Sequence, residues 1–231
     1  MITVSIAGTN YDVKTSFDEV DIFEYLEWLT LADKPIIERV AAYTGIPVDK
    51  LNLLTIESFN GIAGTVAFIE DKALLNVMCE PYTGLNVGLE SYGKIEKAKQ
   101  LLTAKGVMAL PEIVEIYTSR TCPVPLLFAW GACQFYLDGL TAFFAQFAEM
   151  KNFEYSEEEI EAGVETLGQM QHYPTVFKIG RERGLKNDEV LAIPAIEIYM
   201  ELLQSFREAQ YSKQLTEIKK QRAEHFSKLN K

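Results

Sequence analysis

Residues that most often bind metals or transfer protons are scarce in this chain. Its 231 residues include only two histidines, His172 and His225, which lie far apart and have no partner at ligand spacing. A metal site requires a cluster of such groups, so we expect no metal ion and no other cofactor. The three cysteines are an odd and sparse set, which favours free thiols in a reducing compartment over a disulfide framework.

Motifs for phosphate binding and covalent catalysis are also missing. The sequence has no Gly-x-x-x-x-Gly-Lys-Ser/Thr loop, and Ser91 within residues 88–93 (GLESYG) has the wrong spacing for a nucleophile elbow. Gly61 and Gly64 form a GxxG that lies in a helical pattern without flanking bases, unlike the loop of a KH domain. We therefore predict no catalytic residues and a protein that is not an enzyme.

An excess of positive charge is absent as well. The net charge is −11, which argues against direct binding to nucleic acid. Residues 1–71 hold twelve acidic and four basic side chains, whereas residues 207–231 hold three acidic and seven basic ones. This polarity is compatible with copies aligned head to tail, and equally with two differently solvated faces.

The chain does contain one long apolar stretch, residues 126–148 (LLFAWGACQFYLDGLTAFFAQFA). A helix that is hydrophobic all round is buried, either in a protein core or in a bilayer. The stretch is long enough to cross a bilayer, but Asp138 at its centre would be costly there. The flanking charges also lack a positive-inside asymmetry. We predict a buried central helix at about residues 126–150 and no membrane association; the alternative is a membrane-anchored protein that uses this segment.

Polar residues within this stretch follow one narrow stripe, formed by Gln134, Asp138 and Thr141 at i, i+4 and i+7. Because a buried carboxylate needs hydrogen-bonding partners, the pattern predicts that Asp138 and Gln134 are buried polar groups with a structural role. Asp138 is the only ionisable group that we expect to be buried. A contrasting hypothesis is an enzyme or small-ligand-binding helical protein that uses Asp138 and Arg120 in a helical pocket.

The N-terminal residues 1–72 are expected to form a small αβ head. Alternating apolar residues at 2–7 and 11–14, separated by Gly8-Thr9-Asn10, predict a β-hairpin. Ser16 followed by Glu19 matches a capping box and predicts a helix from about 17 to 31. Two further helices are expected after Pro35 and at about 55–69.

Residues 73–231 are expected to form a helical domain. Residues 73–80 fit a strand or a short buried helix, and alternation at Leu85, Val87 and Leu89 suggests a short strand. Helices are predicted at about 91–103, after Pro111, from a second capping box at Ser156 and Glu159 to about 171, and at about 174–183, 187–193 and 195–229. Residues 120–125 should be an extended connector, because Pro123 and Pro125 disfavour a helix. The fold class is therefore mainly α (α+β), a hairpin and helices followed by a helical bundle around a buried central helix.

The long C-terminal helix changes character along its length. Its first half is broadly apolar, whereas its second half carries one thin, heptad-like stripe: Tyr211, Leu215, Ile218, Arg222, His225 and Leu229. An isolated helix of this kind is marginally stable in water. We therefore predict an assembly surface made by Tyr211, Leu215, Ile218, Arg222 and Leu229, which docks on another copy or another protein. The alternative is a frayed, solvated tail.

The order of several segments resembles small tail-assembly and tail-structure proteins of tailed bacteriophages. The resemblance is carried by I-x-V-x-I-x-G-x-x-Y-x-V at 2–13, DIFEYL at 21–26, A-x-TGIP-x-x-x-L at 42–51, LESYGK at 89–94, DEVL at 188–191 and Y-x-x-L at 199–202. It implies a non-enzymatic homo- or hetero-oligomer that contacts other virion or tail proteins in the host bacterial cytoplasm during assembly or in the virion tail. Within this class, a head–tail connector or a baseplate component is the alternative.

Overall fold

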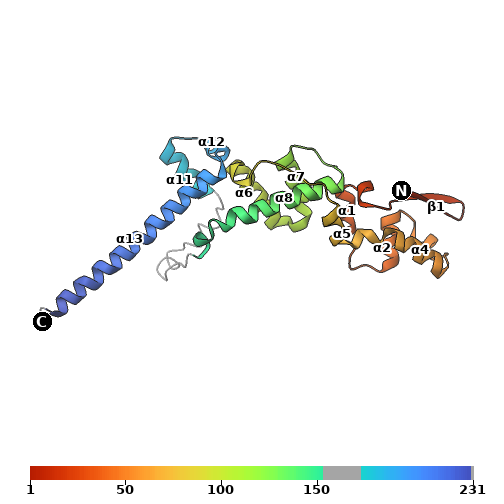
Figure 1. The fold of residues 1–231 in the computed structure, drawn as a ribbon, viewed down its shortest axis with the longest axis horizontal. Helices are drawn as coiled ribbons and strands as arrows, with labels where there is room; N and C mark the ends of the chain where they lie inside the picture. Colours follow the sequence, from red (N-terminus) through yellow and green to blue (C-terminus); the bar gives the residue numbers. More distant parts are fainter. Residues whose placement is uncertain (153–172, 230–231) are drawn as a thin grey trace. The chain divides into compact units, whose positions relative to one another are not determined.

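The computed structural model describes residues 1–152 and 173–229, and these are mainly helical with one small β-hairpin (Figure 1). The prediction of a mainly α fold is confirmed. Chain contacts divide the protein into two compact units, Met1–Gly84 with Lys97–Asp138, and Leu85–Glu96 with Gly139–Lys231. The domain boundary predicted after residue 72 falls inside the first unit.

The first unit begins with the predicted hairpin. Strands β1 (Ile2–Ile6) and β2 (Thr9–Val13) pair antiparallel, with Ile2 opposite Val13 and Ile6 opposite Thr9. The chain reverses at Ala7 and Gly8, which both have a positive φ. Val13 is completely buried, so the hairpin attaches to the unit through the end of β2.

The remaining elements of the N-terminal region are short helices. They are η1 (Phe17–Glu19), α1 (Ile22–Leu29), α2 (Ile36–Thr44), α3 (Val48–Leu51), α4 (Ile56–Val66), η2 (Ala67–Glu70) and α5 (Lys72–Met78). The prediction of a capping box at Ser16 is wrong, because its side chain does not cap a helix there. Asp21 takes that role: its carboxylate accepts from the backbone N–H groups of Phe23 and Glu24, and the Glu24 side chain accepts from the Asp21 N–H. Helix α1 therefore starts later than predicted.

The middle of the chain contains η3 (Val87–Leu89), α6 (Tyr92–Lys105), η4 (Gly106–Ala109), α7 (Leu110–Thr118), α8 (Leu126–Ala145) and η5 (Ala148–Asn152). The ambiguous stretch at 73–80 is helical up to Met78, as α5. The predicted strand at 85–89 is wrong, because residues 87–89 form a 3-10 turn instead. Asn86 stabilises this turn, since its side chain accepts from the Gly88 N–H at 2.9 Å.

Helix α8 is central to the packing, but it is not buried on every side. Its buried positions follow the helical repeat and include Leu126, Cys133, Tyr136 and Leu140. Asp138 lies on the opposite side, since each residue advances by about 100°, and it is exposed. The prediction that Asp138 is a buried polar group is therefore wrong.

Gln134 differs from Asp138, because a neighbouring helix covers its part of α8. It is half-buried, and its Nε2 donates to Asn76 Oδ1 on α5 at 2.7 Å. The Cys79 thiol donates to Gln134 Oε1 at 3.3 Å, and the Trp130 indole N–H donates to the same Asn76 oxygen at 2.7 Å. The expected polar seam thus exists at Gln134 and does not extend to Asp138.

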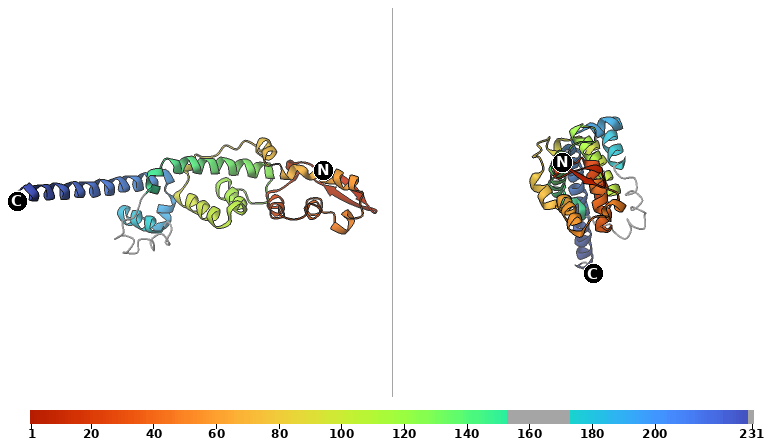
Figure 2. Two further views of the ribbon diagram at one scale, coloured as in Figure 1. Left: turned by 90° about the horizontal axis from the view of Figure 1, so that it is seen from below. Right: turned by 90° about the vertical axis from the view of Figure 1, so that its right-hand side faces the viewer.

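The second unit ends with α11 (Tyr173–Arg183), α12 (Asn187–Ala192) and α13 (Ala195–Leu229), close to the predicted bounds. The predicted capping box at Ser156 and Glu159 lies outside the described residues. Figures 1 and 2 show the C-terminal half of α13 extending clear of α11, α12 and the other described elements of this unit.

Candidate assembly surface

The first residues of α13 are fixed to the second unit by backbone hydrogen bonds. The Ala195 N–H donates to the Glu90 carbonyl at 2.8 Å, and the Tyr92 N–H donates to the Ile193 carbonyl at 2.8 Å. Pro194 lies just before the helix. Because proline has no backbone N–H, it adds no unsatisfied donor at the start of α13. The start of α13 is therefore tied to the start of α6.

A buried tyrosine–carboxylate pair fixes the next turn of α13. The Tyr199 hydroxyl donates to Glu96 Oε1 on α6 at 2.9 Å, and both residues are buried, with exposed fractions of 8% and 6%. The Tyr199 ring also contacts a cluster of aromatic rings at centroid distances of 5.2–6.0 Å, formed by Tyr92, Phe143, Phe144 and Phe147. Sequence reasoning missed this pair, although Glu96 shares a helical face with Tyr92 at i, i+4.

This environment raises the pKa values of two tyrosines. Burial and then the nearby Glu96 carboxylate raise the pKa of both Tyr92 and Tyr199 well above the ordinary range. A tyrosine in an unfolded chain titrates at about pH 10. Above that pH the folded chain keeps the hydroxyl protons of these two tyrosines, whereas the unfolded chain releases them. The contribution to stability is complete below about pH 10 and decreases as the pH rises further.

We therefore expect the urea midpoint of unfolding to decline steeply above about pH 10. Tyr199→Phe should reduce this slope, because phenylalanine has no hydroxyl to titrate. The measurement is urea unfolding at a series of pH values between pH 8 and 11 for both proteins. Identical slopes would show that Tyr199 does not carry the alkaline sensitivity.

Polar contacts extend the attachment along the outer side of α13. Arg183 Nη2 of α11 pairs with Glu201 Oε2 at 2.6 Å, and Arg207 Nη2 pairs with Glu149 Oε1 at 2.5 Å. These pairs are partly exposed, and exposed ion pairs contribute little to stability. The two ion pairs instead orient α13 at the point where its contacts with the rest of the second unit end.

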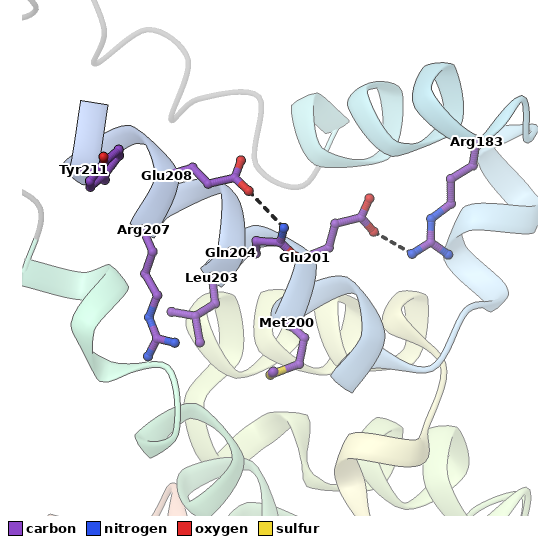
Figure 3. A pocket seen from close by; sticks show the side chains of 8 residues that line it. All are labelled: Arg183, Met200, Glu201, Leu203, Gln204, Arg207, Glu208 and Tyr211. Carbon is purple, nitrogen blue, oxygen red and sulfur yellow. Dashed lines mark hydrogen bonds and ion pairs between the residues drawn. The ribbon is translucent and has the colours of Figure 1, made fainter. Parts of the chain in front are cut away.

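An open groove runs along the face of α13 that carries Glu201 and Arg207, and it begins next to Arg183 (Figure 3). It has a volume of about 760 Å³ and is lined by Met200, Leu203, Arg207 and Tyr211, among others. Figure 3 shows Arg183 directed toward Glu201, and Gln204 toward Glu208, along one side of the helix. The groove therefore leads directly to Tyr211, the first residue of the predicted assembly surface.

The described side chains of the predicted assembly surface are exposed or half-buried. Tyr211 is 65% exposed, Ile218 is 46% exposed and Leu215 is half-buried. Arg222 is exposed, while the side chain of Leu229 lies outside the described part. At about 100° per residue, positions 200, 204, 211, 215, 218 and 222 share one face of α13. This face therefore continues as a largely apolar stripe, with the basic Arg222 at its end, beyond the other described elements of the second unit.

The alternative pocket based on Asp138 and Arg120 does not form. The Arg120 guanidinium lies 4.0 Å from the centre of the Phe128 ring. Phe128 and Asp138 are ten residues apart on α8, which is about 15 Å along the axis of a helix. The two charged groups are therefore not brought to one site.

The surroundings of two of the cysteines disfavour the thiolate. Burial raises the pKa of the Cys133 thiol to about 12. Burial and nearby carboxylates, Glu115 first among them, also raise the pKa of Cys122. All three cysteines are free. A thiolate nucleophile requires the opposite shift.

Residues 1–152 and 173–229 offer neither a candidate metal site nor a candidate membrane span. No group of three or more His, Cys, Asp or Glu side chains in these residues could hold a metal ion. None of the helices in the described segments combines the length and the apolarity needed to span a bilayer. No protein-family model, curated protein or solved structure matches the chain.

Proposed function

We propose that this chain is a non-enzymatic structural or assembly protein of a tailed bacteriophage tail, acting through protein–protein contacts. The observation that carries the proposal is the exposed half of α13, whose stripe at Tyr211, Leu215 and Ile218 leaves the body with large apolar side chains uncovered. Burying each such side chain in a partner would contribute about 1.5–3 kcal/mol. The bacteriophage context rests on the sequence resemblance, and with it we propose that the chain acts in the host bacterial cytoplasm during assembly.

The anchored first half of α13 supports this function. A binding helix is effective when its orientation is fixed before the partner arrives, because less conformational freedom is lost on binding. The contacts at Ala195, Tyr199 and Glu201 provide this fixation within the second unit. A head–tail connector or a baseplate component would use the same surface, so the proposal does not depend on which tail part is formed.

Deletion of residues 211–231 is expected to leave a folded monomer that no longer assembles. The described side chains between 211 and 225 are exposed, apart from the half-buried Leu215, so their loss should change the core little. Light scattering should give the mass of the assembled full chain and of a monomeric deletion variant, and circular dichroism should show that the variant is folded.

The same variant tests the virion partners. The full chain and the deletion variant are each expressed with the proteins of a candidate phage tail, and the captured proteins are identified by mass spectrometry. We expect tail components with the full chain and not with the deletion variant. An unchanged mass together with unchanged capture would show that this helix is not an assembly element.

A further inference from the structure

A second surface, on the first unit, has the length and the charge to receive this helix. Helices α1 and α7, with the turn η4, enclose an open groove of about 580 Å³. Phe23 and Glu27 of α1 line it together with Thr30, which follows that helix, and Met108, Glu112 and Glu115 line it from η4 and α7. Each set has the spacing i, i+4, i+7. The groove is therefore bordered by two stripes, each about two helical turns long, or roughly 10 Å.

The groove combines apolar and acidic groups. Phe23 is 48% exposed and Met108 is 42% exposed, which leaves large apolar surface uncovered. Of the charged residues that line it, all three are glutamates. Lys105 pairs with Glu112, and its hydrogen bond lowers the pKa of that carboxyl. Glu27 makes no side-chain hydrogen bond or ion pair to another described residue. A basic amphipathic helix has the complementary chemistry.

The exposed half of α13 has these properties. Tyr211, Leu215 and Ile218 also stand at i, i+4, i+7, so their stripe is about 10 Å long and matches the groove. Lys219 and Arg222 follow at one end of the stripe and are exposed. Docking a helix through such anchors into an apolar groove is a common mode of recognition.

We propose that residues 211–222 of one copy dock in the α1–α7 groove of a second copy. This inference rests on the proposed function and names the partner of the assembly surface. Tail-to-tail pairing is a poorer solution, because a parallel pair with this heptad register would place Arg222 against Arg222 of the other copy. A contact between two different surfaces is heterologous, so successive copies form a closed ring or an open filament.

Charge reversal on either side of the contact provides the test. The groove variant is Glu27→Lys, and the tail variant is Lys219→Glu with Arg222→Glu; all three residues are exposed. Sedimentation of the purified full-length chain at low salt should show self-association. Each variant alone should associate at least about tenfold more weakly, because like charges meet at the contact.

An equimolar mixture of the two variants should recover self-association. In the mixture, the unchanged tail meets an unchanged groove and the reversed tail meets the reversed groove, so both contacts pair opposite charges. Higher salt should weaken the unmodified assembly, because exposed charges are screened beyond about 10 Å at 0.1 M. Glu57→Lys is the matched control: it is exposed on α4, changes the net charge equally and should leave association unchanged.

Three results would overturn the inference. The first is a groove variant that associates as well as the unmodified chain, since tail-to-tail pairing would not involve Glu27. The second is two variants that stay dissociated when mixed. The third is an unmodified chain that stays monomeric at all concentrations. None of these decides the proposed function, which is tested separately by the capture of tail components.

Discussion

Gly131→Ala is expected to destabilise the protein by at least about 2 kcal/mol, although alanine is the better helix former. A Cβ atom at position 131 of α8 would lie 2.0 Å from the carbonyl oxygen of Glu80. This oxygen belongs to the backbone of a segment that is itself tied to α8, since the Glu80 N–H donates to the Leu127 carbonyl at 3.3 Å. The gain in helix propensity is only about 1 kcal/mol, so the steric cost dominates.

Gly64→Ala is the matched control for this substitution. Gly64 also lies within a helix, α4, but a Cβ atom there would have no neighbour within 4 Å. We expect Gly64→Ala to stabilise the protein by about 0.5–1 kcal/mol. Urea unfolding of both variants measures the difference. If the two alanines had the same effect, the close approach between α8 and residue 80 would be wrong.

Gly131 also illustrates which features could be predicted from the sequence. The turn signal at Gly8 and the proline at 111 act on their immediate neighbours, so they predict the hairpin and the start of α7. The apolar run at 126–148 likewise predicts a long helix. Which residue of this helix touches residue 80 depends on a neighbour about fifty residues earlier in the chain, which no local pattern specifies.

The errors at the sequence level have a similar origin. Ser16 and Asp21 are both acceptable helix caps, and the choice of Asp21 depends on how α1 packs. Asp138 was expected to be buried because the residues around it are apolar. Burial is decided by the side of the helix that other segments cover, and Asp138 faces away from the buried stripe.

The stripe on the exposed half of α13 was predicted, whereas its anchor and the groove proposed to receive it were not. The stripe at Tyr211, Leu215 and Ile218 is contained in one helix, so its periodicity is visible in the sequence. The pair of Glu96 and Tyr199 joins residues 103 positions apart. The groove likewise requires α1 and α7 to lie side by side, which only the folded chain shows.

Tyr199→Ala is expected to destabilise the attachment of α13 by about 4 kcal/mol, as for other large buried aromatic residues. The substitution removes a ring that contacts Phe143, Phe144 and Phe147, and it removes the donor to the buried Glu96 carboxylate. Tyr199→Phe keeps the ring and removes only the hydroxyl. A hydrogen bond to a charged group contributes about 1.5–3 kcal/mol, so this variant should be affected less.

The consequence for assembly follows from the position of Tyr199 between the body and the exposed half of α13. When the start of the helix loses its fixed orientation, docking of residues 211–222 must restore it, and the affinity falls by that cost. We expect self-association to weaken in the order unmodified chain, Tyr199→Phe, Tyr199→Ala, although none of the residues in the proposed contact is changed. Urea unfolding and sedimentation of the three proteins measure the two effects together. An alanine variant with unchanged stability and unchanged association would show that Tyr199 does not anchor the helix.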